Sequence, residues 1–397
     1  MTEGGDRLRV AFVITRLNIG GPALEVLLLH QRLDRSRFHT MVLTGAATPT
    51  EGDMREVVAS SDMDVRLVRG LRREVSPLDD VRAFFALVGE FRKFRPGVVH
   101  THMAKAGMLG RIAARVSGVP VVVHTSHGNV LRGYFGPRRS TAFSWLERLL
   151  ALLSTRIVTL SPRQSAEIVA LAVAPASKLT EVPLGVDLVP LLTAERGALR
   201  RELGIAAGVP LIGTVARLVP IKAVDTFIQA AAVVARQRSD ARFVVAGDGP
   251  LRAPLEELAR TLGLEDRLVF LGWRADLPAI YGDLDVVVLT SRNEGFPVSL
   301  IEALAARCAV VATAVGGVPD LIRDGITGYL VQPDDPNAVA RAVENLLRSP
   351  DLRTRMGVAG RDSVYPAYDA SAVVANMSNL YRDLVNGRGG ARADRAP

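Results

Sequence analysis

Short β-rich runs alternate with amphipathic helical stretches along this chain, and that alternation limits its fold more than any other feature. A first series of apolar runs lies at 9–15, 39–43, 64–68, 97–100, 119–124 and 156–160. Amphipathic stretches at 78–94, 105–117 and 140–153 lie between them. Such alternation is typical of right-handed βαβ units, so it predicts a parallel sheet covered by helices.

The same pattern then begins again. A second series of apolar runs lies at 210–216, 241–247, 267–272, 284–290 and 309–313, with helical stretches near 223–237, 251–262 and 297–307. Between the two series, residues 183–200 are rich in Pro, Gly and polar side chains. We therefore predict an α/β protein with two Rossmann-like domains, 1–188 and 189–365, followed by a helix at 366–386 and a disordered tail at 387–397.

The composition is typical of a cytoplasmic globular protein. Of the 397 residues, 48% are hydrophobic and 23% are charged, which excludes a wholly disordered chain. No apolar run approaches the roughly 18 residues that span a bilayer, and the first residues lead directly into a strand. Cys308 is the single cysteine, so no internal disulfide is expected.

The net charge of +8 suggests an anionic partner. The arginines are spread along the chain, and neither a zinc-ligand spacing nor an aromatic-basic platform is present. Nucleic acid is therefore not predicted as a partner, and an arginine-rich solvated surface explains part of the excess charge.

Two cations follow the first strand of the second series. Arg217 ends the strand, and Lys222 precedes the apolar stripe of the next helix, which places it in the first turn. A cation there opposes the helix dipole, and an anion held by both would relieve this. Arg217 and Lys222 therefore predict a diphosphate site, although two solvated loop cations remain an alternative. The Gly20-Gly21 turn before the first helix also suits an anion, but taken alone a plain tight turn is the better explanation.

The stretch NEGFPVSLIEA carries two glutamates eight residues apart. Glu294 lies in the loop after a strand, Pro297 suits the first residue of a helix, and Glu302 lies more than one turn inside that helix. An acid–base pair needs carboxyl groups roughly 5 to 9.5 Å apart across one bond, and a loop and a helix flank do not converge in this way. The two carboxylates are better suited to separate hydroxyls of one extended ligand.

Several motifs, by their sequences and by their order along the chain, resemble those of the retaining nucleotide-sugar glycosyltransferases of the GT-B fold (glycosyltransferase family 4, of the group 1 type). The resemblance covers nearly the whole chain. It rests on Glu-x7-Glu headed by EGFP, together with HTHMAKAGMLGRIAAR, VHTSHGNV, EVPLGVD, ARLVPIK and GGVPDLIRDGITGYLV. The resemblance implies two Rossmann-like domains facing across a cleft, an N-terminal acceptor domain, a C-terminal donor domain and a last helix that crosses back to the first domain.

The resemblance also implies roles for individual residues. Arg217 and Lys222 would hold the diphosphate, Glu302 the ribose, and Glu294 the sugar, while His127 would orient the sugar or stabilise the transition state. A second set would contact the donor mainly through backbone: Gly20, Gly21, Trp273, Gly295, Phe296, Pro297 and Val298. A histidine at a strand end is also often a satisfied core residue, so His127 keeps that alternative.

Some positions depart from the family pattern. Ala223 stands where the family usually has Gly after the lysine, Leu184 where it has Asn, and Asp320 where it often has Glu. None of these changes removes a charged contact, but Ala223 puts in doubt how closely the loop approaches phosphate.

The implied reaction is metal-independent hexosyl or N-acetylhexosaminyl transfer with retention, from a donor that we expect to be a UDP-sugar, without a cofactor. Two Asp-x-Asp triplets, at 62–64 and 283–285, precede short strands and indicate turns instead of metal clamps. Arg217, Lys222 and a helix N-terminus would stabilise the leaving diphosphate in place of a metal.

The acceptor is less constrained by the sequence. The segment 129–156 mixes arginines with aromatic residues, which suits a lipid-linked glycan at an anionic membrane face, although an ordinary amphipathic helix fits equally well. We expect a role in cell-surface polysaccharide synthesis. The alternatives are a small-molecule acceptor, a UDP-sugar 2-epimerase and a non-catalytic nucleotide-sugar sensor.

Overall fold

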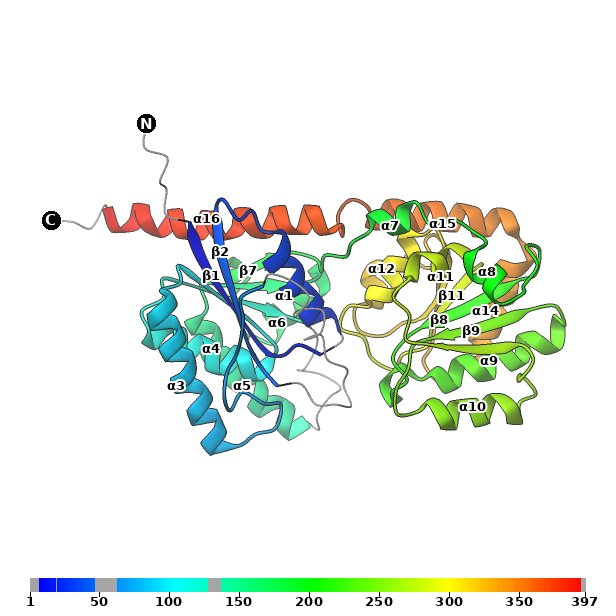
Figure 1. Ribbon diagram of the computed structural model, residues 1–397, viewed down its shortest axis with the longest axis horizontal. Helices are drawn as coiled ribbons and strands as arrows, with labels where there is room; N and C mark the ends of the chain where they lie inside the picture. The colour runs from blue at the N-terminus through cyan, green and yellow to red at the C-terminus, as the bar shows by residue number, and fades with distance from the viewer. Residues whose placement is uncertain (1–6, 19, 47–62, 128–136, 394–397) are drawn as a thin grey trace. The chain divides into compact units, whose positions relative to one another are not determined.

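The computed structural model describes residues 7–18, 20–46, 63–127 and 137–393, which form two compact units (Figure 1). The N-terminal unit comprises Met1–Gly185 together with Ser371–Pro397, and the C-terminal unit comprises Val186–Ala370. Each unit contains one parallel sheet with helices on both faces.

The sheet of the N-terminal unit has the strand order β3-β2-β1-β4-β5-β6-β7, and every pair is parallel. Its strands are β1 (Leu8–Arg16), β2 (Phe38–Gly45), β3 (Val65–Leu67), β4 (Val98–His102), β5 (Val121–Ser126), β6 (Arg156–Thr159) and β7 (Leu179–Glu181). The six predicted strands of this domain are confirmed.

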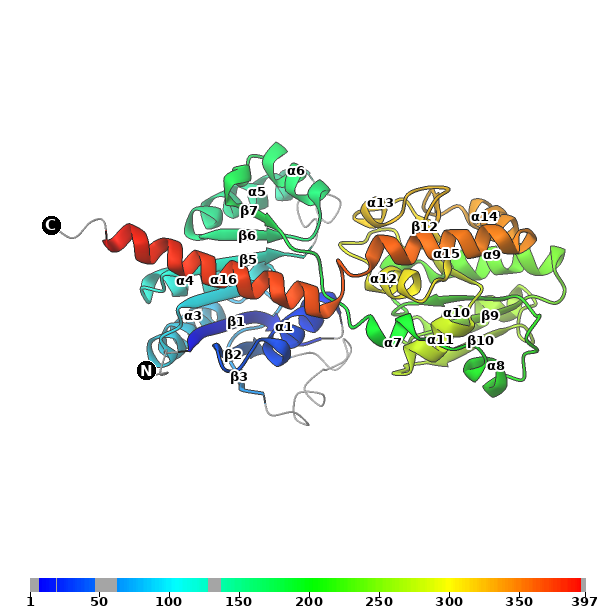
Figure 2. The same cartoon turned by 90° about the horizontal axis from the view of Figure 1, so that it is seen from above.

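Helices cover both faces of this sheet. One apolar cluster joins α1 (Gly21–Arg32) and α16 (Ala370–Ala393) to one face, and another joins α3 (Pro77–Phe94) and α4 (Ala104–Val116) to the opposite face. Near the far edge lie α5 (Pro137–Leu153) and α6 (Pro162–Ala170) (Figure 2).

The last helix belongs to the core of the N-terminal unit. Val373, Met377 and Tyr381 of α16 are fully buried against residues of β1 and α1. The helix also continues through residues 387–393, which were expected to be part of a disordered tail. Gly387, Gly389 and Gly390 disfavour helix, but adding residues to an existing helix avoids the cost of a new nucleus, and the tail prediction is wrong for these residues.

The sheet of the C-terminal unit has the order β10-β9-β8-β11-β12-β13, again parallel throughout. Its strands are β8 (Leu211–Val215), β9 (Arg242–Ala246), β10 (Leu268–Gly272), β11 (Val286–Leu289), β12 (Ala309–Thr313) and β13 (Tyr329–Val331). The five predicted strands are confirmed. The helices are α7 (Val189–Leu192), α8 (Ala198–Glu202), α9 (Val224–Gln237), α10 (Arg252–Thr261), α11 (Leu277–Asp283), α12 (Val298–Ala305), α13 (Val318–Leu321), α14 (Pro336–Arg348) and α15 (Pro350–Val364).

Each sheet has one point where the strand order reverses, and ligands of such sheets bind beside this point at the carboxyl ends of the strands. The reversal lies between β1 and β4 in the N-terminal unit and between β8 and β11 in the C-terminal unit. The loops that follow these four strands are therefore the first place to look for a site.

The second Asp-x-Asp triplet has a structural role. Asp283 is fully buried and accepts from the backbone N–H groups of Gly197 and Arg200, at 2.5 and 2.9 Å. Asp285 forms ion pairs with Arg196 and Arg200, at 2.6 and 2.9 Å. These contacts fasten α8 to the strand β11.

Within the described ranges, no helix is both long enough and apolar enough to cross a membrane.

Candidate active site

The loop after β8 carries the two predicted cations. Residues Pro220–Lys222 form a single 3-10 turn, and α9 begins only at Val224. Lys222 therefore lies two residues before the helix and not in its first turn, because Ala223 adopts a left-handed conformation (φ 46°, ψ 46°) that interrupts the helix. The Arg217 side chain is half-buried and forms no hydrogen bond or ion pair with the residues that the structure describes.

Lys222 meets the loop that follows the neighbouring strand β11. Its Nζ lies 2.5 Å from Oε1 of Glu294, and the Ser291 hydroxyl donates to the same oxygen at 2.6 Å. The Glu294 side chain is only 7% exposed, so this ion pair is largely shielded from water. The structure thus brings together two residues that lie far apart in the sequence and that were both predicted to bind one ligand.

Further contacts join these two loops. The backbone N–H of Arg292 donates to Ile221 at 2.9 Å, and its guanidinium donates to the Pro220 carbonyl at 2.9 Å. The Thr290 hydroxyl donates to the Ala223 carbonyl at 2.8 Å. These bonds hold the backbone on both sides of Lys222, and the ion pair with Glu294 locates its ammonium group.

The loop after β12 packs against the backbone of Glu294. Gly316 has a φ of 52°, and a Cβ at this position would lie 1.8 Å from the Glu294 carbonyl oxygen. The N–H of Gly317 donates to that same oxygen at 3.1 Å. Only glycine permits this close approach, so the Gly-Gly pair determines where the Glu294 backbone lies. The sequence pointed to this loop, because Gly316 and Gly317 begin the motif GGVPDLIRDGITGYLV, one of those on which the family resemblance rests.

The left-handed Ala223 predicts a stability effect. An alanine in this conformation is strained by about 1 kcal/mol, whereas glycine adopts it freely. Ala223→Gly is therefore expected to relieve strain in the folded state and to change the melting temperature by no more than a few degrees, because glycine also gains entropy in the unfolded chain. Calorimetry checks this, with Ala232→Gly inside α9 as the matched control. The control is expected to destabilise more than Ala223→Gly, and the reverse order would contradict the strain.

Glu302 lies on α12, where Tyr281 holds its side chain. The Tyr281 hydroxyl lies 2.9 Å from Oε2 of Glu302, and burial raises the pKa of this carboxyl to about 7. Tyr281, on α11, was not predicted because nothing in its local sequence points toward the site.

The expectation that Pro297 is the first helical residue is wrong, because Pro297 has an extended backbone and caps α12, which begins at Val298.

If Glu302 binds the ribose of a UDP-sugar donor, as the family resemblance implies, its raised pKa predicts how donor binding depends on pH. Only the ionised carboxylate offers all its oxygens as acceptors to two hydroxyls, so UDP-glucose is expected to bind more weakly as the pH falls from 8 to 6. UDP-glucose suits this measurement because its diphosphate does not titrate in this range. Calorimetric titration of wild type and Glu302→Gln provides the comparison. The variant should bind weakly with no pH dependence, and a pH dependence equal to that of wild type would rule out Glu302 as its origin.

Three of the remaining predicted residues lie in the C-terminal unit, in the loops after β11 and β10. Phe296 stacks on Tyr368 with ring centroids 5.7 Å apart, and Gly295 is exposed. Trp273 directly follows β10 and is 52% exposed. Gly247 donates to the Gly272 carbonyl at 2.8 Å, which pairs the loops after β9 and β10.

In the N-terminal unit, Gly20 and Gly21 stand at the start of α1. The Gly20 carbonyl accepts from Ala23 and Leu24, both at 3.1 Å, so it caps the helix, and α1 begins at Gly21. Residue 19 lies outside the described residues.

His127 follows β5 and lies within a buried group of histidines. Its Nε2 is 2.9 Å from Nδ1 of His102, and its Nδ1 is 3.5 Å from a carboxylate oxygen of Glu25. The rings of His102 and His100 lie 4.1 Å apart, and His100 also contacts Tyr381 and Thr125, each at 2.7 Å. Burial lowers the pKa of His127 to about 3, so the imidazole is neutral at physiological pH.

Comparison with known proteins assigns the family. Residues 195–363 match the model of the family described as "Glycosyl transferases group 1", and residues 20–185 match the "Glycosyl transferase 4-like domain". A solved structure of HepE from Anabaena in complex with UDP and glucose has a TM-score of 0.79 at 20% identity, over 95% of this chain and all of that one. Sucrose-phosphate synthase from Thermosynechococcus elongatus has a TM-score of 0.81 at 22% identity, over 96% of this chain and all of that one.

Two relatives are similar in sequence over most of their length. The UDP-Gal:alpha-D-GlcNAc-diphosphoundecaprenol alpha-1,3-galactosyltransferase of Escherichia coli is 30% identical over 79% of this chain and 82% of its own length. The alpha-D-kanosaminyltransferase of Streptomyces kanamyceticus is 31% identical over 80% of this chain and 89% of its own length. The chain is therefore a glycosyltransferase with the GT-B fold, and it belongs to the group 1 family.

Proposed function

We propose that this enzyme transfers a hexosyl or N-acetylhexosaminyl group from a UDP-sugar to a hydroxyl of a lipid-linked glycan, with retention of configuration and without a metal ion. The observation that carries the donor assignment is the pairing of the β8 and β11 loops. Arg217, whose half-buried side chain pairs with none of the described residues, and the Lys222–Glu294 ion pair follow neighbouring strands at the point where the strand order reverses.

The roles follow from the chemistry of each group. Arg217 and Lys222 would hold the diphosphate and stabilise the negative charge that develops as it leaves, and no step then requires a metal. Glu294 would accept from sugar hydroxyls and Glu302 from the ribose. The backbone of Gly295, Phe296, Pro297 and Val298 would hold sugar and phosphate, Gly20 and Gly21 would close over the donor, His127 would contact the sugar, and Trp273 would lie by the base.

Retention is part of the proposal. Among the described residues at the β8 and β11 loops, Glu294 is the one carboxylate at the site, and its Oε1 is occupied by Lys222 and Ser291, so it is poorly placed to attack an anomeric carbon. An acceptor hydroxyl that attacks from the face of the departing diphosphate can pass its proton to a phosphate oxygen. The acceptor oxygen then forms the new glycosidic bond as the sugar–phosphate bond breaks, with the same configuration at the anomeric carbon.

Two comparisons support the choice of donor and acceptor. The HepE structures contain UDP or UDP-glucose, and the Escherichia coli relative acts on a sugar linked to diphosphoundecaprenol. A cytoplasmic enzyme that uses such an acceptor has to work at the inner membrane surface.

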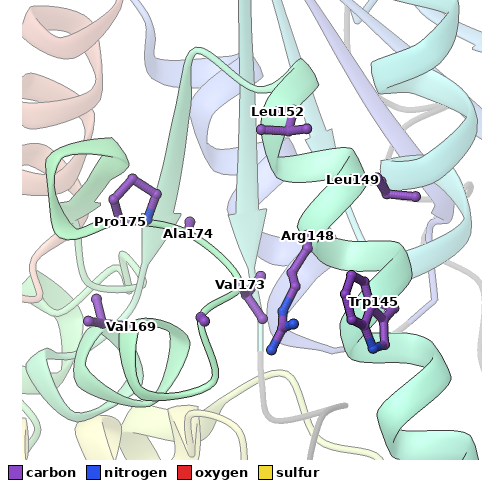
Figure 3. Close-up of a pocket in the computed structure, with 9 residues that line it drawn as sticks. Trp145, Arg148, Leu149, Leu152, Val169, Val173, Ala174 and Pro175 are labelled. Atoms are coloured by element: carbon purple, nitrogen blue, oxygen red, sulfur yellow. The ribbon is translucent and has the colours of Figure 1, made fainter.

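An exposed apolar hollow in the N-terminal unit supports membrane contact. It encloses about 550 Å³ between α5 and the end of α6 (Figure 3). Trp145, Leu149 and Leu152 on α5 are 60 to 71% exposed along one helix face. The Arg148 guanidinium lies 4.9 Å from the Trp145 ring centroid, which places a cation next to this apolar surface. Residues 129–136 of the predicted membrane segment lie outside the described residues.

The charge is distributed unevenly between the units. The sequence of the N-terminal unit contains 29 Lys and Arg against 18 Asp and Glu, a net charge of +11. The sequence of the C-terminal unit contains 20 Lys and Arg against 23 Asp and Glu, a net charge of −3. The unit with the apolar hollow thus carries all of the positive excess, which suits attraction to anionic lipid.

The decisive experiment is a panel of nucleotide sugars scored by release of nucleoside diphosphate, with and without undecaprenyl-diphosphate-linked GlcNAc. Release that depends on the acceptor supports the proposal, and EDTA should leave it unchanged. NMR of the product reads the anomeric configuration, and inversion would overturn the mechanism. Conversion of the donor without acceptor would indicate a 2-epimerase, and binding without turnover a sensor.

A separate experiment tests membrane contact. The protein is expected to float with phosphatidylglycerol vesicles and to float less after Trp145→Ser and Leu149→Ser together. Equal flotation with neutral phosphatidylcholine vesicles would exclude the electrostatic component. Absence of flotation with anionic vesicles would overturn the proposal of membrane contact.

A further inference from the structure

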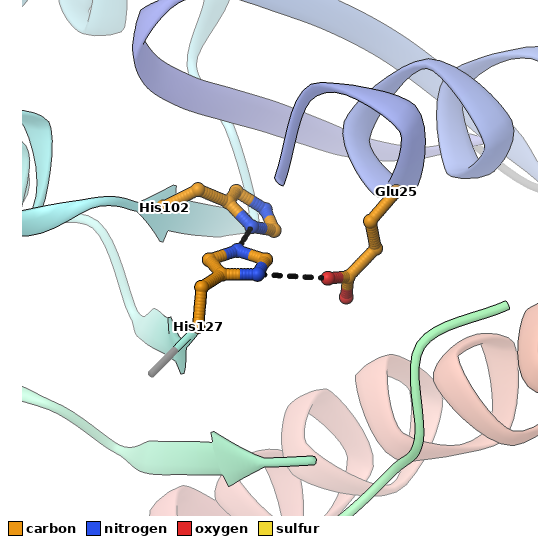
Figure 4. Close-up of side chains that lie close together, drawn as sticks. All are labelled: Glu25, His102 and His127. Carbon is orange, nitrogen blue, oxygen red and sulfur yellow. Dashed lines mark hydrogen bonds and ion pairs between the residues drawn. The ribbon is translucent and has the colours of Figure 1, made fainter. Parts of the chain in front are cut away.

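Glu25, His102 and His127 form a buried cluster at the carboxyl ends of β4 and β5 (Figure 4). Glu25 projects from α1 with a side chain that is 0% exposed, and the His127 side chain is 8% exposed. His127 lies in the middle, with Nε2 toward His102 and Nδ1 toward Glu25, at 2.9 and 3.5 Å. Both nitrogens of one imidazole therefore face groups that can donate or accept a proton.

Glu25 is costly for the fold. Neither of its carboxylate oxygens has a hydrogen-bond partner within the described residues, and burial raises the pKa of this carboxyl to about 8. A buried polar group without partners destabilises a folded protein, whereas an apolar side chain of similar size would pack there favourably. Since stability does not account for Glu25, its position beside His127 calls for a functional explanation.

The hydrogen bonds of the cluster can run in either of two directions, and one of them gives the Glu25 O–H an acceptor. In the reverse direction Glu25 would only accept, and its own O–H would then have no acceptor among the described residues. A neutral carboxyl has one O–H donor, and a neutral imidazole has one donor and one acceptor nitrogen. If Glu25 donates to Nδ1 of His127, the His127 proton lies on Nε2, and that N–H donates to Nδ1 of His102. The lowered pKa of His127 and the raised pKa of Glu25 both fit this neutral chain.

We infer that Glu25 is a positioning residue that holds His127 in the tautomer with its proton on Nε2, so that His127 can donate a hydrogen bond to the transferred sugar. This inference rests on the proposed function, in which His127 contacts that sugar. When no sugar is present, the Nε2–H of His127 donates to His102. When the sugar binds, the same N–H donates to a sugar hydroxyl. Glu25 keeps the tautomer in both states because it acts on the other nitrogen.

A metal ion is the competing explanation for two histidines and a glutamate. His102 lies at Nε2 of His127 and Glu25 at Nδ1, so the two neighbours contact opposite nitrogens of one ring, and a single cation cannot lie between His127 and both of them. The geometry therefore favours a hydrogen-bonded chain over a metal site.

The test combines activity, stability and spectroscopy on the full chain. Glu25→Leu is expected to lower kcat by about 10- to 100-fold with little change in KM, as partners that orient a functional histidine typically do. It should not lower the melting temperature, because leucine removes the cost of burying a carboxyl whose contact with His127 is as long as 3.5 Å. Glu25→Gln can still donate to Nδ1 and should recover most of the activity.

A double-mutant cycle separates positioning from general damage. The variant that combines Glu25→Leu with His127→Ala should be no slower than His127→Ala alone, because Glu25 acts only through His127. Multiplied losses would overturn the inference, and so would a Glu25→Gln enzyme as slow as Glu25→Leu.

Imidazole nitrogen NMR reads the tautomer without any assay of activity. The sequence has only six histidines, and the His127→Ala spectrum assigns the His127 signals. Wild type should show the proton on Nε2, and Glu25→Leu should show a mixture of tautomers. A proton on Nδ1 in wild type would overturn the inference, as would a stoichiometric zinc content that His102→Ala abolishes. Failure of every donor to turn over would instead refute the proposed function, while the spectra still report on Glu25.

Discussion

Replacing Lys222 with alanine is expected to lower kcat/KM for the nucleotide sugar by about 100- to 1,000-fold, the usual cost of one preorganised group that stabilises developing charge. In the proposed function Lys222 is such a group, and three observations support this role. Its ammonium lies 2.5 Å from Glu294, and its side chain is only 19% exposed. The backbone N–H and the guanidinium of Arg292 donate to the carbonyls of Ile221 and Pro220 and hold its turn. Because a dry, fixed cation acts strongly on a phosphate, most of the loss should appear in kcat.

Nucleoside diphosphate release over a range of donor concentrations measures this effect. Lys222→Met tests the charge alone, because methionine keeps most of the side-chain volume. Arg260→Ala is the matched control, since Arg260 is an exposed cation of the same unit that pairs only with Glu257 among the described residues. A Lys222→Ala enzyme as active as Arg260→Ala would remove Lys222 from the site, and a change confined to KM would restrict it to ground-state binding.

Most of the fold could be predicted because parallel strands are buried on both faces and are therefore apolar throughout. All eleven predicted runs form strands, and the long amphipathic stretches form α3, α4 and α9. The sequence did not reveal β7 and β13. Each has three residues, so no run of apolar side chains is long enough to show a pattern. The extension of α16 beyond residue 386 was missed because composition alone favoured a tail.

The charged part of the site was predicted less completely. Lys222 and Glu294 could be identified because each belongs to a local motif with a chemical reason. Their direct contact could not, because it depends on β8 and β11 becoming neighbours in the sheet. Tyr281, Ser291 and Glu25 were missed for the same reason, since they reach their partners only in the folded chain and lie in ordinary helices or loops.

The buried histidines predict that acid unfolds the N-terminal unit selectively. Burial lowers the pKa of five of them, to about 3 or 4 for three and well below the usual value for two: His30, His100, His102, His124 and His127. Below pH 6.5 the unfolded chain binds protons at these positions and the folded chain does not. Each group then costs about 1.4 kcal/mol per pH unit as the pH falls.

Glu25 has the opposite effect on the pH dependence of stability. Its pKa rises to about 8 on folding, so the folded chain binds a proton that the unfolded chain releases, and the folded state gains stability as the pH falls from 8 to 4.5. One carboxyl offsets one histidine. The net loss between pH 6.5 and 4.5 is therefore on the order of 5 kcal/mol per pH unit, which corresponds to a fall in melting temperature of roughly 10 to 20 °C per pH unit.

The chain contains its own control for this prediction, because all six histidines lie in the sequence of the N-terminal unit and none in that of the C-terminal unit. Calorimetry of the full chain should show one transition that moves steeply to lower temperature below pH 6.5 and another that moves little. In the proposed function UDP binds the C-terminal unit, so added UDP should raise the temperature of the second transition and identify it. His124→Asn should reduce the pH dependence of the first transition by one proton. Transitions that shift together, or a first transition that stays in place down to pH 5, would show that these histidines are not held neutral in the folded protein.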